Sequence, residues 1–348
     1  MARFEIGLRT SGDDAELFRL YEEFFGAELT ASSRRRWPWQ YGANPHAEEG
    51  EVVWVGRRDA TPVGQMATMP VWLWWGDKEV RASWGMDFFV RRNEQGRGLG
   101  PRLTRAWTDH VDAALAIGLT PPAYALYKRM GFKDVGKLPF FQKVVDPVAV
   151  ARRRFGKLLG SLSGPFVAMG LRLIRPSLRS VDKTVAVAES KQFTAEYRGL
   201  WDRAKSSYAM CVRRDPDYLR WKYLDSEKPY TIWEARRDGA LVGFAVSRIE
   251  DYRGLRIGWL IDVFAHASDH GAKGALIRAI LDAFRHAGVA RAQAFCLNRE
   301  LQMDLRREGF FEGDSTSLFC VMAPDGSDDV FTDRDRWHVV FGDADMDR

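Results

Sequence analysis

The sequence predicts an α/β (α+β) protein made of two similar domains, each a mixed, mainly antiparallel sheet flanked by helices. Three observations support this fold class. Strand-like alternation and amphipathic helical spacing follow one another along the chain. A set of landmarks in the first half recurs in the same order in the second half. The chain has 348 residues, enough for about two domains of ordinary size.

The recurring landmarks keep a nearly constant separation of 175 to 182 residues. Four pairs match: Trp39-Gln40-Tyr41 with Trp221-Lys222-Tyr223, Val63-Gly64 with Val242-Gly243, Asp87 with Asp262, and YKRMGF at 127–132 with LRREGF at 305–310. Because all four keep one order and nearly one offset, they indicate an internal duplication. We therefore expect a first domain at 1–146, a linker at 147–182 and a second domain at 183–348.

The first copy begins with a strand, and Ser11 with Asp14 forms a capping box that opens a helix running to about Phe25. Three strands joined by hairpins follow, at 51–58, 62–75 and 79–90. A helix from about Gly100 to Ala116 has apolar residues on one face. A short apolar run, a helix ending at Gly131 and a strand at 140–145 complete this copy.

The second copy repeats this layout. Strands are expected at 232–237, 240–249, 255–265, 290–297 and 315–323, with helices near 271–287 and before Gly309. Its order of elements is the same as in the first copy, so both copies predict the same fold.

The net charge of +5 comes from one segment. Residues 151–180 hold seven basic residues and no acidic one, which leaves 45 basic against 47 acidic residues elsewhere. Without a basic stripe on a folded face, nucleic-acid binding is not expected. The segment is interpreted as a solvated linker, and an amphipathic contact of 147–182 with an anionic membrane surface is the alternative.

The sequence favours a cytoplasmic protein. No apolar run approaches the ~20 residues that span a bilayer, and the first residues lack the pattern of a secretory signal. The three cysteines, Cys211, Cys296 and Cys320, are too few and too scattered for a disulfide framework or a zinc site. We therefore expect no metal, and the sequence leaves the oligomeric state open.

The segment QGRGLG at 95–100 has the composition of a phosphate-binding loop. It lies between a strand and a helix, with glycine at every second position. Glycine permits close backbone approach, and free N–H groups at a helix start bind anions. A Rossmann loop would need glycine at position 101, which is Pro101, and the Gly-Lys-Ser/Thr of a P-loop is absent.

This loop resembles the Q/R-x-x-G-x-G/A pyrophosphate loop of GNAT acetyltransferases, with Gln95, Gly98 and Gly100 at the defining positions. YKRMGF, with Tyr127 four residues before Gly-Phe, resembles the second motif of that superfamily. The likeness covers about residues 1–145 in layout. It implies acetyl-CoA as co-substrate and a small-molecule amine as acceptor. The implied acetyl-CoA contacts are Phe89, Val90, Gln95, Gly96, Arg97, Gly98, Leu99 and Gly100.

The resemblance implies Tyr127 as the general acid that protonates the leaving thiolate, because a phenol is protonated at neutral pH. A packing role for Tyr127 is the alternative. Asp87 is the leading candidate for the base, although Asp262 at the same place in the second copy favours a structural role. Weaker candidates are Glu22, Glu23, Glu94 and His110.

The second copy is expected to keep the fold and lose the ligand. Gly271 and Gly274 cannot both fill the two glycine positions of the pattern, and Leu305 stands where Tyr127 stands in the first copy. A pocket between the two domains is a possible acceptor site, and Trp37 and Trp39 are candidates for stacking on a sugar or nucleotide acceptor.

Three further interpretations stay open. One is an aminoacyl-transferring enzyme with paired GNAT-like domains, and another is a non-catalytic acyl-CoA-binding protein. The third concerns the acidic residues Asp343, Asp345 and Asp347, which are interpreted as a solvated tail after a last edge strand. A lid over the acceptor site, or a weak Mg²⁺ site, is the alternative for these acids.

Overall fold

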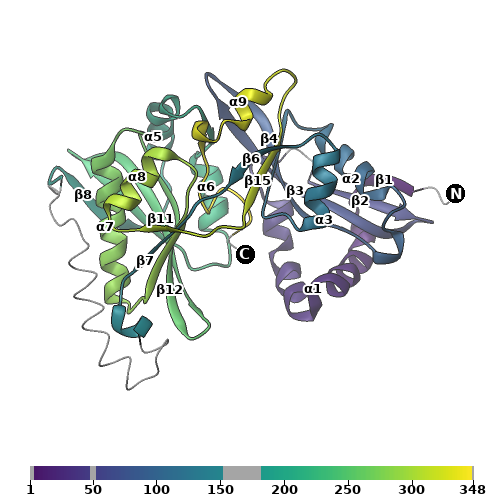
Figure 1. Cartoon of the computed structure of the whole chain (residues 1–348), viewed down its shortest axis with the longest axis horizontal. Coiled ribbons are helices and arrows are strands. Elements are labelled where there is room, and N and C mark those ends of the chain that lie inside the picture. The colour runs from purple at the N-terminus through teal and green to yellow at the C-terminus, as the bar shows by residue number, and fades with distance from the viewer. Residues whose placement is uncertain (1–3, 48–51, 152–181, 347–348) are drawn as a thin grey trace.

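The computed structural model describes residues 4–47, 52–151 and 182–346. Two sheets lie side by side, with elements of the first half of the chain on the right of Figure 1 and those of the second half on the left. Both sheets are mainly antiparallel and carry helices, which confirms the predicted fold class. Most of the linker expected at 147–182, and with it the proposed membrane contact, lies outside the described residues.

The first sheet follows the strands predicted for the first copy. It runs in the order β1-β2-β3-β4-β5-β15-β6, with β1 at Phe4–Leu8, β2 at Val53–Arg58, β3 at Thr61–Trp75, β4 at Lys78–Val90 and β5 at Ala113–Ile117. Its helices are α1 at Asp14–Trp37, α2 at Leu99–Thr108 and α3 at Pro121–Arg129. Helix α1 is interrupted at Gly26, whose φ is 80°.

Helix α2 packs closely on the first sheet because the strand beneath it carries a glycine. The buried indole of Trp107 lies over Gly85, where an added Cβ would come within 2.6 Å of the ring. The Trp107 Nε1 donates to Ser83 Oγ at 2.6 Å. Burying a side chain of leucine size contributes about 1.5–3 kcal/mol, so this contact and buried Leu103 hold the middle and the end of α2 against the sheet.

Two local predictions need correction. The helix expected from Gly100 to Ala116 ends at Thr108, and the run at Ala113–Ile117 is strand β5. All five residues of β5 are buried, and a strand buried on both faces has a continuous apolar run that does not alternate. The predicted capping box is present one residue earlier, between Thr10 and Asp13.

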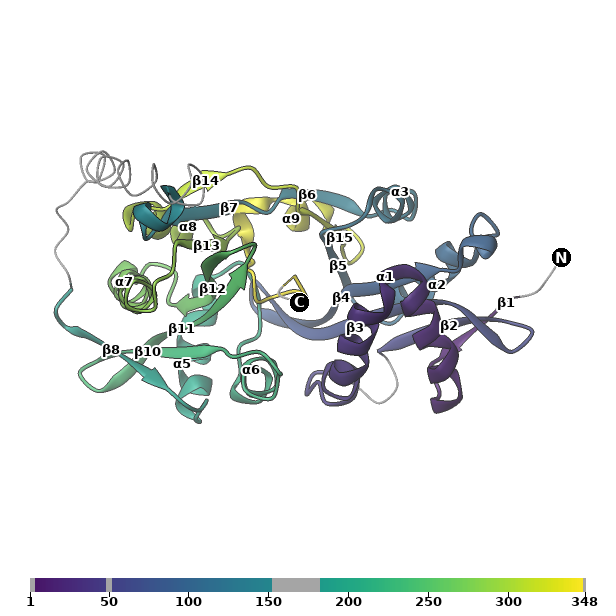
Figure 2. The same cartoon turned by 90° about the horizontal axis from the view of Figure 1, so that it is seen from below.

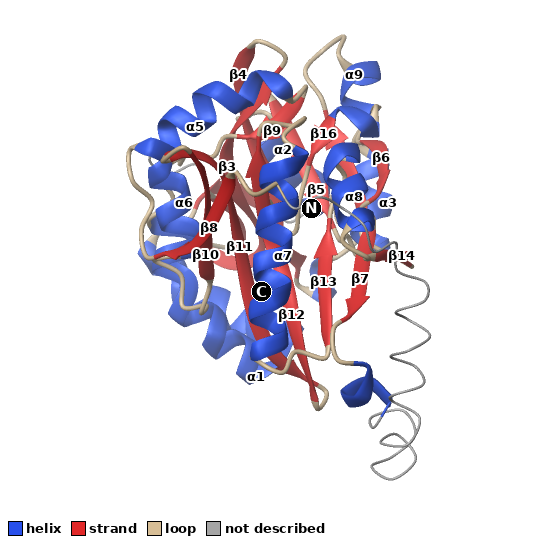
Figure 3. Cartoon of the chain, turned by 90° about the vertical axis from the view of Figure 1, so that its left-hand side faces the viewer, coloured by secondary structure: helices blue, strands red, loops and turns tan. Residues whose placement is uncertain are grey.

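The second sheet runs in the order β14-β7-β13-β12-β11-β10-β8. Its strands from the second half are β8 at Val185–Ser190, β10 at Thr231–Arg237, β11 at Ala240–Tyr252, β12 at Leu255–Ala265, β13 at Arg291–Phe295 and β14 at Phe311–Gly313. The helices include α5 at Glu196–Ala204, α6 at Pro216–Tyr223, α7 at His270–His286 and α8 at Arg299–Arg307. Figure 3 shows α7 lying over the face of this sheet, where it contacts β8, β10, β11 and β12.

Each half gives strands to the sheet of the other half. Strand β6, at Lys133–Lys137, closes the first sheet, but β7, at Phe140–Val144, pairs with β13 in the second. In return β15, at Leu318–Met322, lies between β5 and β6 of the first sheet. Figure 2 shows β6 and β7 following one another along one side of the molecule.

This exchange means that the ranges 1–146 and 183–348 do not each contain one complete sheet. The link between β6 and β7 consists of Leu138 and Pro139, which lack the Asn-Gly type of sequence that closes a tight hairpin. The chain therefore runs on into the neighbouring sheet, where Cys296 N donates to Pro139 O at 3.1 Å. The boundaries predicted from the duplication therefore separate the two repeats of the sequence. They do not separate the two sheets.

The C-terminal segment also crosses between the halves. Strand β9, at Met210–Val212, pairs with β3, and β16, at Trp337–His338, pairs with β9. Helix α9, at Asp328–Thr332, precedes β16. Among the described helices, none is both long and apolar enough to span a membrane.

Candidate active site

Strands β4 and β5 separate in the middle of the first sheet. Their parallel ladder ends at the pair Trp84 and Leu115, whereas β4 continues to Val90. The backbone of β4 beyond Trp84 therefore has no ladder partner in β5. A gap of this kind leaves N–H and C=O groups available to an extended ligand.

The glycine-rich loop follows β4 directly and leads into α2. Gly96 and Gly98 have φ values of 76° and 86°, in the left-handed region that favours glycine. A Cβ added at Gly98 would meet nothing within 4 Å, so the loop is open on that side. No side chain of the described residues caps α2 at Gly98, which leaves its N–H groups directed at the opening.

The other predicted residues of this loop hold it in place. Gln95 Nε2 donates to Val90 O at 2.8 Å, which ties the loop to the end of β4. Leu99 is 1% exposed and belongs to the core. Arg97 is half exposed, with its Nε 3.7 Å from Glu94 Oε2.

Asp87 lies at a bulge of β4 and has an unusual backbone conformation. Its φ is 45°, and the register between β3 and β4 shifts at this point. Tyr21 donates its hydroxyl to Asp87 Oδ2 at 2.8 Å, and the Tyr41 hydroxyl donates to the same oxygen. Gln65 Nε2 donates to Tyr21 Oη at 2.8 Å. Burial and the charge of Asp87 raise the pKa of Tyr21 well above its usual value.

Tyr127 is enclosed by apolar side chains on the other side of the sheet. It is 1% exposed, its ring stacks on Phe132 at 4.6 Å between centroids, and its hydroxyl lies 3.7 Å from Met66 Sδ. Burial raises the pKa of Tyr127 above its usual value. The phenol therefore holds its proton at neutral pH, as a general acid must.

No hydrogen bond between described residues joins Asp87 to Tyr127. Phe89, two residues after Asp87, has its ring against α1, with centroids 5.0 Å from Tyr21. Phe88 points to the other layer, 6.1 Å from the Tyr127 ring and 3.5 Å from a Cβ added at Gly100. Phe88 thus lies between the loop and Tyr127, a position that the sequence reasoning did not identify.

The weaker candidates for the base have other surroundings. Glu94 is 4% exposed and its carboxylate accepts from Arg58 at 2.6 Å. Glu22 and Glu23 are exposed on α1, and Glu23 lies 3.3 Å from Arg91. His110 is exposed, with its Nδ1 2.6 Å from Ala106 O.

In the second copy Asp262 has a different partner from Asp87. It is 3% exposed and lies 3.1 Å from the guanidinium of Arg214, which also binds Asp343 at 2.9 Å. The Tyr223 hydroxyl donates to Asp262 at 3.2 Å. Asp343 is therefore buried in an ion pair, which corrects the expectation of a solvated acid at that position. Asp347 lies outside the described residues.

Carboxylates lie at the helix start in the second copy where the first copy has an open loop. Asp269 caps α7 by accepting from Ala272 N at 2.9 Å. A Cβ added at Gly271 would lie 2.5 Å from Asp182 Oδ2. Both carboxylates also pair with Arg237, at 3.3 and 2.9 Å, so side chains already occupy the start of α7 where a phosphate would bind.

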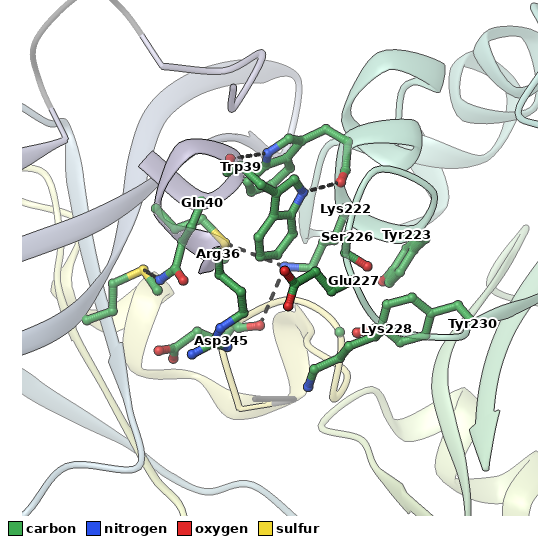
Figure 4. Close-up of a pocket in the computed structure, with 15 residues that line it drawn as sticks. Arg36, Trp39, Gln40, Lys222, Tyr223, Ser226, Glu227, Lys228, Tyr230 and Asp345 are labelled. Carbon is green, nitrogen blue, oxygen red and sulfur yellow. Dashed lines mark hydrogen bonds between the residues drawn. The ribbon is translucent and has the colours of Figure 1, made fainter. Parts of the chain in front are cut away.

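A cavity of about 40 Å³ lies where the two halves meet (Figure 4). Its wall includes Trp39, Gln40 and Met86 from the first half of the chain and Lys222 and Asp345 from the second half. Gln40 Nε2 donates to Tyr41 Oη at 3.1 Å, so one wall of the cavity adjoins the groups around Asp87.

The two duplicated tryptophans meet beside this cavity. Trp39 Nε1 donates to Trp221 O at 2.6 Å, and Trp221 Nε1 donates to Trp39 O at 2.8 Å. Their rings stack with centroids 5.3 Å apart. The reciprocal bonds give the junction an approximate two-fold symmetry, and they engage Trp39 in the contact between the halves. Trp37 is 7% exposed and lies in the core.

Sequence reasoning missed the groups that surround Asp87. Tyr21, Tyr41 and Gln65 come from three separate elements, and no short motif contains them. A signal was present for Tyr41, because it lies in the repeated Trp-x-Tyr landmark. Among the described residues, no group of three histidines, cysteines or acids could hold a metal ion.

Comparison with known proteins identifies one domain. Residues 49–134 match the sequence model of the acetyltransferase (GNAT) domain. This stretch includes β4, the loop, α2 and α3, and therefore both motifs that the sequence singled out. No curated protein matches the chain.

The whole chain is similar to several solved structures. A GCN5-related N-acetyltransferase from Anabaena variabilis matches with a TM-score of 0.65 and 12% identity, over 93% of this chain and 73% of that one. A probable N-acyltransferase from Enterococcus faecalis has a TM-score of 0.63 and 11% identity, with 93% and 73% covered. The N-myristoyltransferase of Saccharomyces cerevisiae, with bound myristoyl-CoA, has a TM-score of 0.59 and 15% identity, with 93% and 84% covered. At identities this low, the similarity to these structures shows the fold alone.

Proposed function

The chain carries a GNAT acyltransferase domain, and on that premise we propose that it transfers an acetyl group from acetyl-CoA to the amine of a small-molecule acceptor. The observation that carries the proposal is the uncapped start of α2 behind a loop with two left-handed glycines. An open helix N-terminus binds a diphosphate through its N–H groups. The gap between β4 and β5 would take the pantetheine arm beside it.

The packing around Tyr127 favours a short acyl group. Met66, Trp107 and Phe132 are each at most 1% exposed and enclose the phenol. A two-carbon acyl group beside this hydroxyl needs little space, whereas a long chain would have to displace several of these side chains. On this basis we propose acetyl-CoA as the co-substrate over longer acyl-CoA esters.

In the proposed reaction Asp87 and Tyr127 act on opposite sides of the thioester. The Asp87 carboxylate takes a proton from the acceptor amine as its nitrogen attacks the thioester carbonyl carbon. The C–S bond then breaks, the N-acetyl product forms, and the thiolate takes the Tyr127 hydroxyl proton. Free N–H groups of β4 beyond Trp84 would stabilise the negative charge that develops on the carbonyl oxygen.

The cavity between the halves is the proposed acceptor site. Met86 precedes Asp87 on β4 and lines the cavity, as does Gln40, which binds Tyr41. Small-molecule sites are frequent at such junctions. Lys222 and Asp345 give the wall charges of both signs, which would orient a polar acceptor.

The test is release of free thiol from acetyl-CoA in the presence of amines. The panel contains glucosamine, spermidine and 2-phenylethylamine, and myristoyl-CoA replaces acetyl-CoA in a parallel series. We expect amine-dependent thiol release with acetyl-CoA and a slower reaction with myristoyl-CoA. Tight binding of myristoyl-CoA with no measurable affinity for acetyl-CoA would refute the choice of acyl group.

A further inference from the structure

We infer that Tyr21 and Tyr41 are positioning residues that hold the Asp87 carboxylate for the acceptor amine. The inference rests on the proposed function, because it assigns the two phenols a role through Asp87. It is carried by the bonds of both hydroxyls to Asp87 Oδ2 and by the strained backbone at that residue.

The backbone of Asp87 requires support from its surroundings. A φ of 45° is unfavourable for a residue with a Cβ. Such a conformation persists where neighbouring groups fix it, and it is frequent at active sites. The bulge turns Asp87 to the face of the sheet on which Tyr21 and Tyr41 lie.

Packing and hydrogen bonds fix both phenols. The Tyr21 ring contacts Phe89 and Trp37, with centroids 5.0 and 5.7 Å away. Gln65 Nε2 donates to the Tyr21 hydroxyl, which directs the hydroxyl proton to Asp87. The Tyr41 ring packs on Trp37 at 4.6 Å. Rings held on several sides can maintain a carboxylate within a narrow range of orientations.

The second copy offers an internal comparison. There a tyrosine, Tyr223, also donates to the corresponding carboxylate of Asp262. The guanidinium of Arg214 contacts that carboxylate as well, and all three groups are buried. A neighbouring guanidinium cation disfavours protonation of a carboxylate, whereas neutral phenols orient the carboxylate and add no positive charge. Both copies thus keep a hydrogen bond from a tyrosine to the carboxylate, and the second copy adds a structural ion pair.

Access to Asp87 is consistent with this role. Asp87 is half-buried, whereas Asp262 is 3% exposed. Met86, the residue before Asp87, and Gln40, which donates to Tyr41 Oη, both line the cavity between the halves. An amine in that cavity would therefore approach the groups around Asp87 directly.

A double-mutant cycle tests the inference. The full-length variants are Tyr21→Phe, Tyr41→Phe, Asp87→Asn and each tyrosine change combined with Asp87→Asn. Thiol release is measured with glucosamine, spermidine and 2-phenylethylamine, and acetyl-CoA binding is measured by calorimetry. We expect each tyrosine change to lower kcat about 10- to 100-fold and to leave the Kd for acetyl-CoA within about twofold. In the Asp87→Asn background, neither tyrosine change should lower kcat further.

Tyr197→Phe is the matched control. Tyr197 is also buried and donates its hydroxyl to a carboxylate, Glu234 Oε1, at 3.1 Å, but it lies on α5 of the second half. Its change removes the same atom from a similar bond, so kcat should stay within about twofold. Circular dichroism of every variant checks that the fold is kept.

Four results would contradict these assignments, and they are distinguishable. An Asp87→Asn variant with the full rate would refute the proposed base. A slow Asp87→Asn variant together with unchanged tyrosine variants would overturn the inference alone. The inference alone would also be overturned if the tyrosine changes lower kcat equally in the wild-type and Asp87→Asn backgrounds, because the tyrosines would then act independently of Asp87. No turnover by the unsubstituted protein with any of the three amines would overturn the proposed function and the inference together.

Discussion

The role proposed for Tyr127 as a proton donor depends on the burial of its hydroxyl. Its hydroxyl lies against the Met66 thioether, a weak acceptor, at 3.7 Å. Burial raises the pKa of the phenol, so the proton stays on the oxygen at neutral pH. The apolar surroundings therefore keep Tyr127 in the protonated form that a proton donor requires.

We expect Tyr127→Phe to lower kcat by about 10- to 100-fold while the Kd for acetyl-CoA stays within about twofold. The change removes one oxygen and keeps the stacking of the ring on Phe132. Single-turnover thiol release and calorimetry on the same preparation measure the two quantities. An unchanged single-turnover rate would leave Tyr127 with a packing role only.

Asp215 makes the stability of the protein dependent on pH. It lies 3.1 Å from His46, and both side chains are at most 5% exposed. Burial by itself would raise the pKa of Asp215, but the hydrogen bonds from His46 and from Tyr218 N lower it to about 2. This value is below that of about 3.9 in an unfolded chain. Asp215 therefore stabilises the fold above about pH 4, and this contribution is lost as the pH falls towards 2.

We expect Asp215→Asn to lower the free energy of unfolding by about 2 kcal/mol at pH 7. Asparagine can still cap α6 as Asp215 does, so the change mainly removes the charge. At pH 3 the difference between the two proteins should be smaller, because the carboxylate of the unfolded chain is then largely protonated. Urea unfolding at both pH values measures this, and an equal difference at pH 7 and pH 3 would argue against a charge effect.

At the scale of elements, the loop before α2 could be predicted because all of its signals are local. Gly96, Gly98 and Gly100 lie within five consecutive residues, and their spacing relates directly to the required φ angles. The exchange of β7 and β15 could not be predicted, because alternation identifies a strand but not the sheet it joins. The bonds to Asp87 were missed for a similar reason, since Tyr21 lies 66 residues away in the sequence.

We expect Gly98→Asp to weaken acetyl-CoA binding at least about 100-fold. The new side chain would strain a residue with φ of 86° and would place a negative charge where the diphosphate is proposed to bind. Gly239→Asp is the matched control, since Gly239 has φ of 81° and open surroundings in the turn between β10 and β11. Calorimetry should give wild-type affinity for the control, and equal losses in both variants would indicate general damage to the fold.

At the scale of the whole molecule, the two halves share an architecture and differ in their sites. The duplication predicted from four landmarks corresponds to two sheets of similar order. Fold similarity does not preserve a ligand site, which depends on particular groups. The carboxylates of Asp269 and Asp182 at the start of α7, and the Arg214 pair on Asp262, distinguish the second half from the first.

We expect the chain to bind one molecule of acetyl-CoA. The start of α7 is capped by Asp269, whereas no described side chain caps α2. Calorimetric titration of the full-length protein measures the stoichiometry of acetyl-CoA binding. Gly98→Asp should abolish all binding of acetyl-CoA. Two molecules per chain, or binding that persists in Gly98→Asp, would show that the second half also holds the ligand.

The exchanged strands also have a consequence for the order of synthesis. On the ribosome, β5 and β6 emerge about 205 and 185 residues before the strand that fills the space between them, a delay of roughly 10 to 40 seconds at ordinary rates of translation. During that interval the edge of β5, whose five residues are all buried in the finished protein, has no neighbour on one side. The nascent first half therefore has an unpaired strand edge, which is prone to pair with other chains, until residue 322 has emerged.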